Sequence, residues 1–148
     1  MMHRSAKLAM ATGIATVMLA FAIPAAQSAD VDPVGNWRHT KGKVTIGISY
    51  CGKNLCARIV DLRRKRTKSG EIRTDKENPD PALRDRPLIG INVATDMEPS
   101  GPGRWQGHIY NADDGNTYSA TTIVSGNRMV LKACVGPICK KQTFVKVN

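Results

Sequence analysis

Residues 43–62 read KVTIGISYCGKNLCARIVDL, and this stretch decides the fold. Over residues 43–50 apolar side chains occupy every second position, which is typical of a strand with one buried face. A Gly-Lys-Asn turn follows, and residues 55–62 form a second apolar segment. The stretch therefore predicts a β-hairpin whose two strands are joined by a short turn.

Two cysteines flank this turn and set the expected register of the hairpin. We predict that Ile48 pairs with Ile59, which aligns the apolar side chains on one face. The same register places Cys51 opposite Cys56 on the other face, where a disulfide would bridge the strands. The sequence thus predicts a hairpin that is held at its turn by a covalent bond.

Proline and glycine divide the rest of the chain into short segments without a long helical period. The separators are rich in Gly, Pro, Asn and Asp, the residues that form turns. We expect six more strands, a short one around Trp37 and others over residues 88–95, 104–110, 117–124, 128–134 and 139–147. Eight strands in meander order predict an all-β fold, a small antiparallel up-and-down β-barrel. A two-sheet sandwich is the competing architecture.

The last two predicted strands form a hairpin that resembles the first. Aligning Met129 with Phe144 pairs the apolar residues of both strands on one face. This register also sets Lys132 opposite Lys141, two like charges that repel each other unless both are well solvated. We expect this register because it also brings the second pair of cysteines together.

The four cysteines form two Cys-x4-Cys pairs. In an exported chain such thiols close into disulfides, and the two registers favour the pairs Cys51–Cys56 and Cys134–Cys139. Crosswise links stay open if the two hairpin turns meet in space. One zinc ion held by four thiolates is the alternative, but zinc sites favour tighter spacings and a reducing compartment. We therefore expect disulfides and no metal.

Residues 1–29 have the layout of a secretory signal peptide. Basic residues precede an apolar run over residues 8–26, and Ser28 and Ala29 form a cleavage zone. We expect cleavage there, which leaves residues 30–148 as one barrel domain that is periplasmic or secreted and does not span the membrane. An uncleaved anchor is the alternative, since the apolar run is long. The net charge of +10 suits anionic partners or serves solubility alone.

Between residues 63 and 87 the strand pattern fails, and a long loop of this kind is often functional. In the middle of the loop Asp80 is placed to cap, and Pro81 to begin, one short helical turn. The loop opens with a basic run that can contact an anionic surface: Arg63, Arg64, Lys65, Arg66 and Lys68.

The second half of the loop mixes acidic, amide and basic side chains. Carboxylates grouped in this way can perform acid–base chemistry or bind calcium. A loop locked by salt bridges is the structural alternative. The candidate ligand or loop site consists of Asp75, Asn78, Asp80, Arg84 and Arg86, with Lys76 and Asp85 between them.

Several motifs, taken in order, resemble those of a known family. They are Gly35-Asn-Trp37, Leu55-Cys-Ala-Arg-Ile-Val60, Asp75-x-x-Asn-Pro-Asp80, Arg86-Pro-Leu-Ile-Gly90, Trp105-x-Gly-x-Ile-Tyr110 and Asp114-Gly-x-x-Tyr118. Along essentially the whole mature chain the sequence resembles the exported bacterial proteins called domain of unknown function 2147. The resemblance implies a lipocalin-like or calycin-like barrel, and it implies no established activity.

The resemblance also implies a contact that closes the barrel. In lipocalin-like barrels the Trp of a Gly-x-Trp motif on the first strand packs under a basic side chain of the last strand. Here the pair would be Trp37 and Lys146, a cation–π contact worth about 0.5–2 kcal/mol. The family tends to end in Trp-x-Arg, whereas this chain has Phe144 and Lys146, and lysine lacks the planar group that stacks on an indole.

Three functions follow from these features. The first is a binding module for a small apolar or amphipathic ligand, held in a cavity lined by Ile46, Ile48, Met129 and Phe144. The second is an envelope interaction protein that uses the basic run on an anionic surface or polymer. The third is an enzyme that uses the loop over residues 75–86.

Other functions are disfavoured by what the sequence lacks. Beyond the predicted signal the chain has two histidines, His39 and His108, and neither accompanies a nucleophile motif. We therefore expect no enzyme and no cofactor. Nucleic acid is not an expected partner, because the basic run lacks interleaved aromatic residues and export removes the usual substrates.

Overall fold

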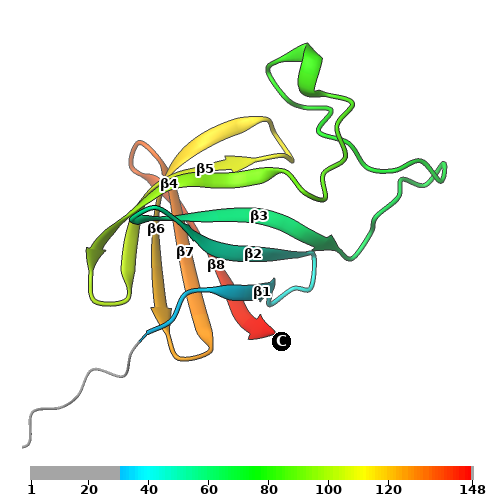
Figure 1. Cartoon of the computed structure of the whole chain (residues 1–148). Coiled ribbons are helices and arrows are strands. Elements are labelled where there is room, and N and C mark those ends of the chain that lie inside the picture. The colour runs from blue at the N-terminus through cyan, green and yellow to red at the C-terminus, as the bar shows by residue number, and fades with distance from the viewer. Residues whose placement is uncertain (1–30, 148) are drawn as a thin grey trace, which may run out of the picture.

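The computed structural model describes residues 31–147, so the predicted signal peptide lies outside the described residues. Eight strands follow one another, with one short 3-10 turn between the third and the fourth (Figure 1). The elements are β1 (Gly35–His39), β2 (Val44–Cys51), β3 (Asn54–Leu62), η1 (Pro81–Leu83), β4 (Asn92–Gly101), β5 (Arg104–Asn111), β6 (Asn116–Ser125), β7 (Arg128–Val135) and β8 (Ile138–Val147).

The strands close into one antiparallel barrel. Each strand pairs with the next along the chain, and β8 pairs with β1. Closure removes the exposed edges that an open sheet would present. The predicted up-and-down barrel is confirmed, and the sandwich alternative is wrong. Within residues 31–147 no helix is both long and apolar enough to cross a membrane.

The predicted register of the β2–β3 hairpin is wrong by two residues. Ile48 pairs with Ala57 rather than with Ile59. The cause is the turn, since only Gly52 and Lys53 separate the strands, with Gly52 at a φ of 70°. A two-residue turn fixes the pairing of both strands, whereas the predicted register needed a longer loop.

The predicted disulfide between Cys51 and Cys56 is nevertheless present. In the observed register Cys51 pairs with Asn54 and Cys56 pairs with Ser49, so the disulfide runs diagonally across the hairpin. The two Cα atoms are 5.8 Å apart, which is within the reach of a disulfide. The cysteine spacing therefore predicted the bond but not the register.

The β7–β8 hairpin has the predicted register. Met129 pairs with Phe144, and the two lysines at 132 and 141 lie directly opposite each other. Cys134 pairs with Cys139, and the two are joined by the second predicted disulfide. The local connectivity is thus confirmed for both cysteine pairs.

The fourth strand begins and ends later than predicted. Leu88 and Ile91 belong to the loop, where their apolar side chains are buried without forming a strand. Gly90 between them has a φ of 102°, a conformation that interrupts an extended chain. At its other end the strand continues through Pro99, which pairs with Trp105. The apolar residues at 88–91 therefore indicated burial and not a strand.

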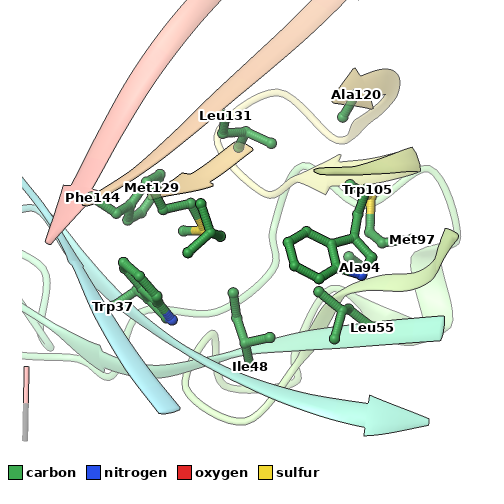
Figure 2. Packing of buried hydrophobic residues seen from close by; sticks show 11 residues of the cluster. Trp37, Ile48, Leu55, Ala94, Met97, Trp105, Ala120, Met129, Leu131 and Phe144 are labelled. Atoms are coloured by element: carbon green, nitrogen blue, oxygen red, sulfur yellow. The ribbon is translucent and has the colours of Figure 1, made fainter. Parts of the chain in front are cut away.

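The interior of the barrel is filled by apolar side chains (Figure 2). Trp37 is fully buried, and Met129 and Phe144 expose 2% and 3% of their surface. The side chains expected to line a ligand cavity therefore pack into this core. The cluster consists of Trp37, Ile48, Leu55, Ala94, Met97, Trp105, Ala120, Val124, Met129, Leu131 and Phe144, with Ile46 against it.

A second apolar cluster forms where the long loop joins the barrel. Ile59 and Leu62 near the end of β3 are buried with Leu88 and Ile91 of the loop. Tyr110 of β5 packs against this cluster. The loop is therefore seated on the barrel by apolar contacts at its C-terminal part, which positions the polar residues described next.

Candidate functional site

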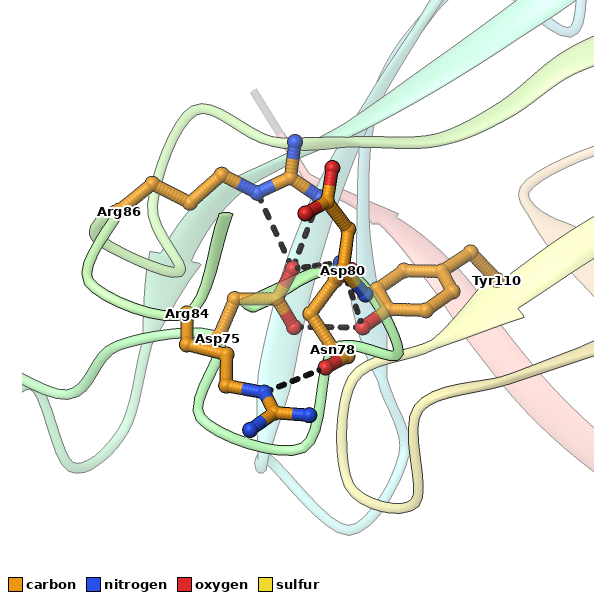
Figure 3. A network of polar contacts seen from close by, with 6 residues as sticks. All are labelled: Asp75, Asn78, Asp80, Arg84, Arg86 and Tyr110. Atoms are coloured by element: carbon orange, nitrogen blue, oxygen red, sulfur yellow. Dashed lines mark hydrogen bonds and ion pairs between the residues drawn. The ribbon is translucent and has the colours of Figure 1, made fainter. Parts of the chain in front are cut away.

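The long loop is ordered around one short helical turn. The Asp80 side chain accepts a hydrogen bond from the backbone N–H of Ala82, and Pro81 begins η1. This is the capped turn that the sequence predicts. It reverses the chain, so that residues 75–78 and residues 84–86 face each other (Figure 3).

Asp75 is the centre of the polar network and is fully buried. One carboxylate oxygen accepts two hydrogen bonds from Arg86, at 3.0 and 2.8 Å, and one from Asn78 at 2.8 Å. The other oxygen accepts a hydrogen bond of 2.6 Å from the Tyr110 hydroxyl (Figure 3). Four donors thus satisfy the buried charge, which would otherwise be very costly.

The network shifts the pKa values of its members in opposite directions. Burial raises the pKa of Asp75, but the hydrogen bonds from Tyr110, Asn78 and Arg86 outweigh burial and hold that pKa below its ordinary value. Burial and the adjacent carboxylate raise the pKa of Tyr110 to about 12. At neutral pH the site is therefore an ionised carboxylate held by neutral and cationic donors.

The remaining loop residues support this centre. Arg84 donates from Nε to the Asn78 carbonyl at 2.7 Å, and the Asn78 side chain accepts from the Asp80 N–H at 2.9 Å. Lys76 lies outside the network and pairs with Glu77 at 3.5 Å. The five predicted site residues therefore lie together, and the arrangement is that of a locked loop.

Tyr110 is the member that sequence reasoning missed. It lies 35 residues from Asp75, on a strand whose other face carries the buried Trp105. A buried carboxylate needs a donor from elsewhere, and an outward-facing tyrosine near a strand end is one signal for it. Nothing in the spacing of the two residues indicates that they meet.

The β5–β6 turn also holds the loop. A Cβ atom at Gly115 would clash with the carbonyl oxygen of Glu77, so the two backbones lie in close contact. Arg73 and Asp113 form an ion pair at 3.6 Å. Together with Tyr110, these contacts fix the middle of the long loop against β5 and its turn.

The basic run forms an ordered projection, which we call the basic finger, residues 63–73. Its two arms are joined by backbone hydrogen bonds from Thr67 to Glu71 at 2.8 Å and from Arg73 to Lys65 at 3.0 Å. Every residue from 63 to 72 is exposed. The finger therefore has no apolar core of its own, and its second arm is joined to the end of the loop by the hydrogen bond from the Leu88 N–H to the Arg73 carbonyl at 3.0 Å.

Two further lysines lie beside the base of the finger. The Arg63 N–H donates to the Lys43 carbonyl at 3.1 Å, which places the β1–β2 turn next to the basic run. We define the basic patch as Lys41, Lys43, Arg63, Arg64, Lys65, Arg66 and Lys68. Sequence reasoning missed the two turn lysines, although any pairing of β2 with β3 brings them near Arg63.

The pKa of His39 depends in part on the positive charges of this patch. Its Nδ1 accepts a hydrogen bond of 3.0 Å from the Lys41 N–H, and its ring contacts the edge of Phe144. Burial lowers the pKa of His39, and the positive charges of Lys41 and Lys43 lower it further. The imidazole is therefore neutral at neutral pH and sensitive to anions nearby.

His108 occupies a different place, on the outer face of the barrel. Asp96 accepts hydrogen bonds from the His108 N–H at 3.0 Å and shares one with Nδ1 at 2.8 Å. The pair lines an open groove of about 460 Å³ together with Ser119, its cross-strand neighbour, and Lys132. Among the described hydrogen bonds none joins Ser119 to His108. Asp96, His108 and Ser119 are therefore not assembled as a catalytic triad in this structure.

The predicted contact that closes the barrel, between Trp37 and Lys146, is present. Trp37 pairs with Lys146, whose Nζ lies 5.6 Å from the centre of the indole ring. The same Nζ donates to the Asp32 carbonyl at 3.0 Å. Lysine thus supplies the cation at this position and is anchored by backbone rather than by stacking.

These features can be compared with known proteins. The family described as "Uncharacterized protein conserved in bacteria (DUF2147)" matches residues 35–146, which include both the barrel and the locked loop. The chain belongs to this family. The matched residues include Asp75, Asn78, Arg86 and Tyr110. No curated protein sequence matches the chain.

A solved structure shares the DUF2147 barrel. It is the protein HP1028 from the human pathogen Helicobacter pylori, described as belonging to the lipocalin family. The likeness has a TM-score of 0.67 at 21% sequence identity, and it covers 80% of this chain and 84% of that chain. At this identity the likeness establishes the lipocalin-like fold. The two disulfides fit a protein of an oxidising compartment.

Proposed function

We propose that this DUF2147 protein is an exported binding module that holds anionic groups of the cell envelope on its basic patch. The observation that carries the proposal is the buried Asp75 lock. It anchors the part of the loop that directly follows an exposed, strongly basic segment. A preorganised charged surface loses less conformational entropy on binding than a mobile one.

The charges of the patch favour an anionic partner. Lys43 and Arg63 lie side by side at the base of the finger, and few acidic side chains offset the patch. The ion pair between Lys65 and Asp61, at 2.9 Å, is one of these. Like charges held close together repel, and an anion that binds between them relieves the repulsion.

The interior-ligand hypothesis has less support than the surface hypothesis. A small apolar ligand would need to displace the core side chains around Trp37 and Met129, which are almost fully buried. The lipocalin-like fold is therefore consistent with a binding module whose ligand site lies on the outside of the barrel. The long loop, rather than the interior, is the place to test.

The enzyme hypothesis is also weakened by the geometry of the loop. Both oxygens of Asp75 accept hydrogen bonds from protein groups, and the carboxylate is inaccessible to solvent. A general base needs access to the proton that it removes. We assign Asp75 and its partners the role of positioning the finger.

Two independent features support export. The predicted signal peptide over residues 1–29 directs the chain across the inner membrane. The two disulfides are stable in an oxidising compartment such as the periplasm. In that compartment the accessible anionic groups are those of lipids, glycans and other envelope polymers.

The test uses charge variants at opposite ends of the barrel. The triple change of Arg63, Arg64 and Arg66 to Gln removes three charges from the patch. The matched control changes Lys53, Arg104 and Arg128 to Gln, three exposed basic residues near the turns at the other end. Binding of both variants to linear polyphosphate is measured by titration over a range of salt concentrations.

The patch variant is expected to lose about 1 kcal/mol of binding free energy per residue, or roughly 100-fold in affinity. The control should lose much less, because its residues lie far from the ligand compared with the Debye length. Equal losses in both variants would show that net charge, and not the patch, determines binding. That result would contradict the proposal.

A further inference from the structure

The turn between β7 and β8 carries the most exposed large apolar side chains of residues 31–147. Val135 exposes 61% of its surface and Ile138 exposes 71%. The two residues pair across the turn, so their side chains project from the same face of the hairpin. Pro137 stands between them. The two side chains form one exposed apolar tip, which is the shape that an apolar phase can receive.

The tip is held rigidly. Gly136 has a φ of 53°, which a tight turn requires, and the disulfide between Cys134 and Cys139 lies directly behind the turn. The bond joins two residues that are already paired in the ladder. The disulfide therefore fixes the shape of the tip, and the tip has little conformational entropy to lose when it contacts a partner.

Lysines surround the hairpin immediately behind the disulfide. Lys132 and Lys141 are direct cross-strand partners, and Lys140 pairs with Ala133. All three are exposed, and no ion pair involves them in the described part of the chain. Lys132 and Lys141 lie on one face of the hairpin, and Lys140 lies on the other face with Val135 and Ile138. Lysines on both faces favour anionic groups that surround the hairpin when its tip is inserted.

We propose that the β7–β8 tip inserts into the interface of an anionic lipid bilayer, with Val135 and Ile138 among the acyl chains. Ile138 and Lys141 are three residues apart on one strand, which corresponds to about 10 Å. That spacing matches the depth to which interfacial segments bury their apolar face, about 5–10 Å below the headgroups. The lysines would then lie at the level of the lipid phosphates.

The topology places this tip and the basic patch at the same end of the barrel. Strands alternate in direction, so the β1–β2, β3–β4 and β7–β8 connections emerge at one end. The lipid inference rests on different residues from the proposed function, and each can fail alone. A membrane that docks on this end of the barrel would contact both the β7–β8 tip and the basic patch.

The test compares two pairs of apolar substitutions. Val135→Thr with Ile138→Thr removes the apolar tip. Ile123→Thr with Val145→Thr is the matched control, since both residues are 39% exposed and lie on strands away from the tip. Each double variant is measured for binding to vesicles of phosphatidylcholine with and without phosphatidylglycerol, and to linear polyphosphate.

We expect the tip variant to bind the anionic vesicles about tenfold more weakly than the control, because the two side chains no longer enter the apolar phase. Its binding to polyphosphate should be unchanged. The patch variant described above should lose binding to polyphosphate. Equal vesicle binding by the tip variant and the control would overturn the lipid inference and leave the proposed function intact.

A spectroscopic reporter gives a second readout. Trp37 and Trp105 are buried, so Ile138→Trp adds the only exposed indole of residues 31–147. We expect its emission to shift to shorter wavelength with anionic vesicles and to be quenched by lipids brominated on the acyl chains. A shift that depends on protein concentration without vesicles would instead indicate self-association of the tips, and it would overturn the inference.

Discussion

The hydroxyl of Tyr110 on β5 donates a hydrogen bond of 2.6 Å to the buried carboxylate of Asp75 in the long loop. The contact joins an ordered loop to the barrel across 35 residues of sequence. It also explains why the loop keeps one conformation although most of its side chains are exposed.

Asp75→Asn should destabilise the fold by about 1–3 kcal/mol. The change replaces one acceptor oxygen with an NH2 group that faces hydrogen-bond donors, and a buried polar group left without its partner has a cost of that size. Urea unfolding followed by circular dichroism measures the loss. Asp113→Asn is the control, since that side chain is 81% exposed and its ion pair is worth little. Similar losses in both variants would refute the role given to Asp75.

Tyr110→Phe should change how stability depends on alkaline pH. The pKa of Tyr110 is raised to about 12 from an ordinary value of 10.0, so the unfolded chain loses this proton first. The contribution of Tyr110 is therefore present below pH 10 and is lost as the pH rises from 10 to 12. The unfolding free energies of the wild type and the variant should differ at pH 8 and should converge as the pH rises from 10 towards 12. A constant difference would contradict the assignment.

The pKa of His39 should rise when the basic patch binds an anion. Lys41 and Lys43 contribute to its lowered pKa, and a bound anion offsets their charge. Titration of the imidazole by NMR with and without polyphosphate measures the change. The variant with Arg63, Arg64 and Arg66 changed to Gln is the control, and polyphosphate should raise the pKa of His39 less in it than in the wild type. An unchanged His39 would place the anion elsewhere.

Gly115→Ala should destabilise the protein by more than Gly136→Ala does. Both glycines have a positive φ, 72° and 53°, so both substitutions strain the backbone by about 1 kcal/mol. Only at Gly115 would the new Cβ meet backbone, the Glu77 carbonyl, whereas the space at Gly136 is open. Thermal unfolding of the two variants separates strain from the loop contact. Equal melting temperatures would show that the loop does not rest on this turn.

The sequence predicted the barrel because its signals are local. Alternation in residues 43–50 and turn residues between short segments report strands and turns directly, and closure follows from a meander of eight strands. The register of β2–β3 could not be read in this way. It depends on whether Asn54 belongs to the turn or to the strand, a difference that one residue type does not decide.

The candidate site was predicted in its members, and a loop locked by salt bridges was one of the roles expected for them. Asp75 and Arg86 lie close in sequence, so a polar cluster was foreseeable. The full burial of Asp75 depends on Tyr110, which comes from another strand, and no pattern in one sequence reports that contact. The filled interior was likewise hidden, because the same side chains can line a cavity or pack into a core.

The central claim is that the Asp75 lock positions the basic finger, and its most direct test is the affinity of Asp75→Asn for linear polyphosphate. The affinity is measured without urea, at a temperature where circular dichroism shows that the barrel is intact. The variant gains one positive charge, which by itself strengthens binding to a polyanion. If the lock positions the finger, affinity falls, by about three- to tenfold, because the finger must be ordered on binding. Unchanged or tighter binding would contradict the account.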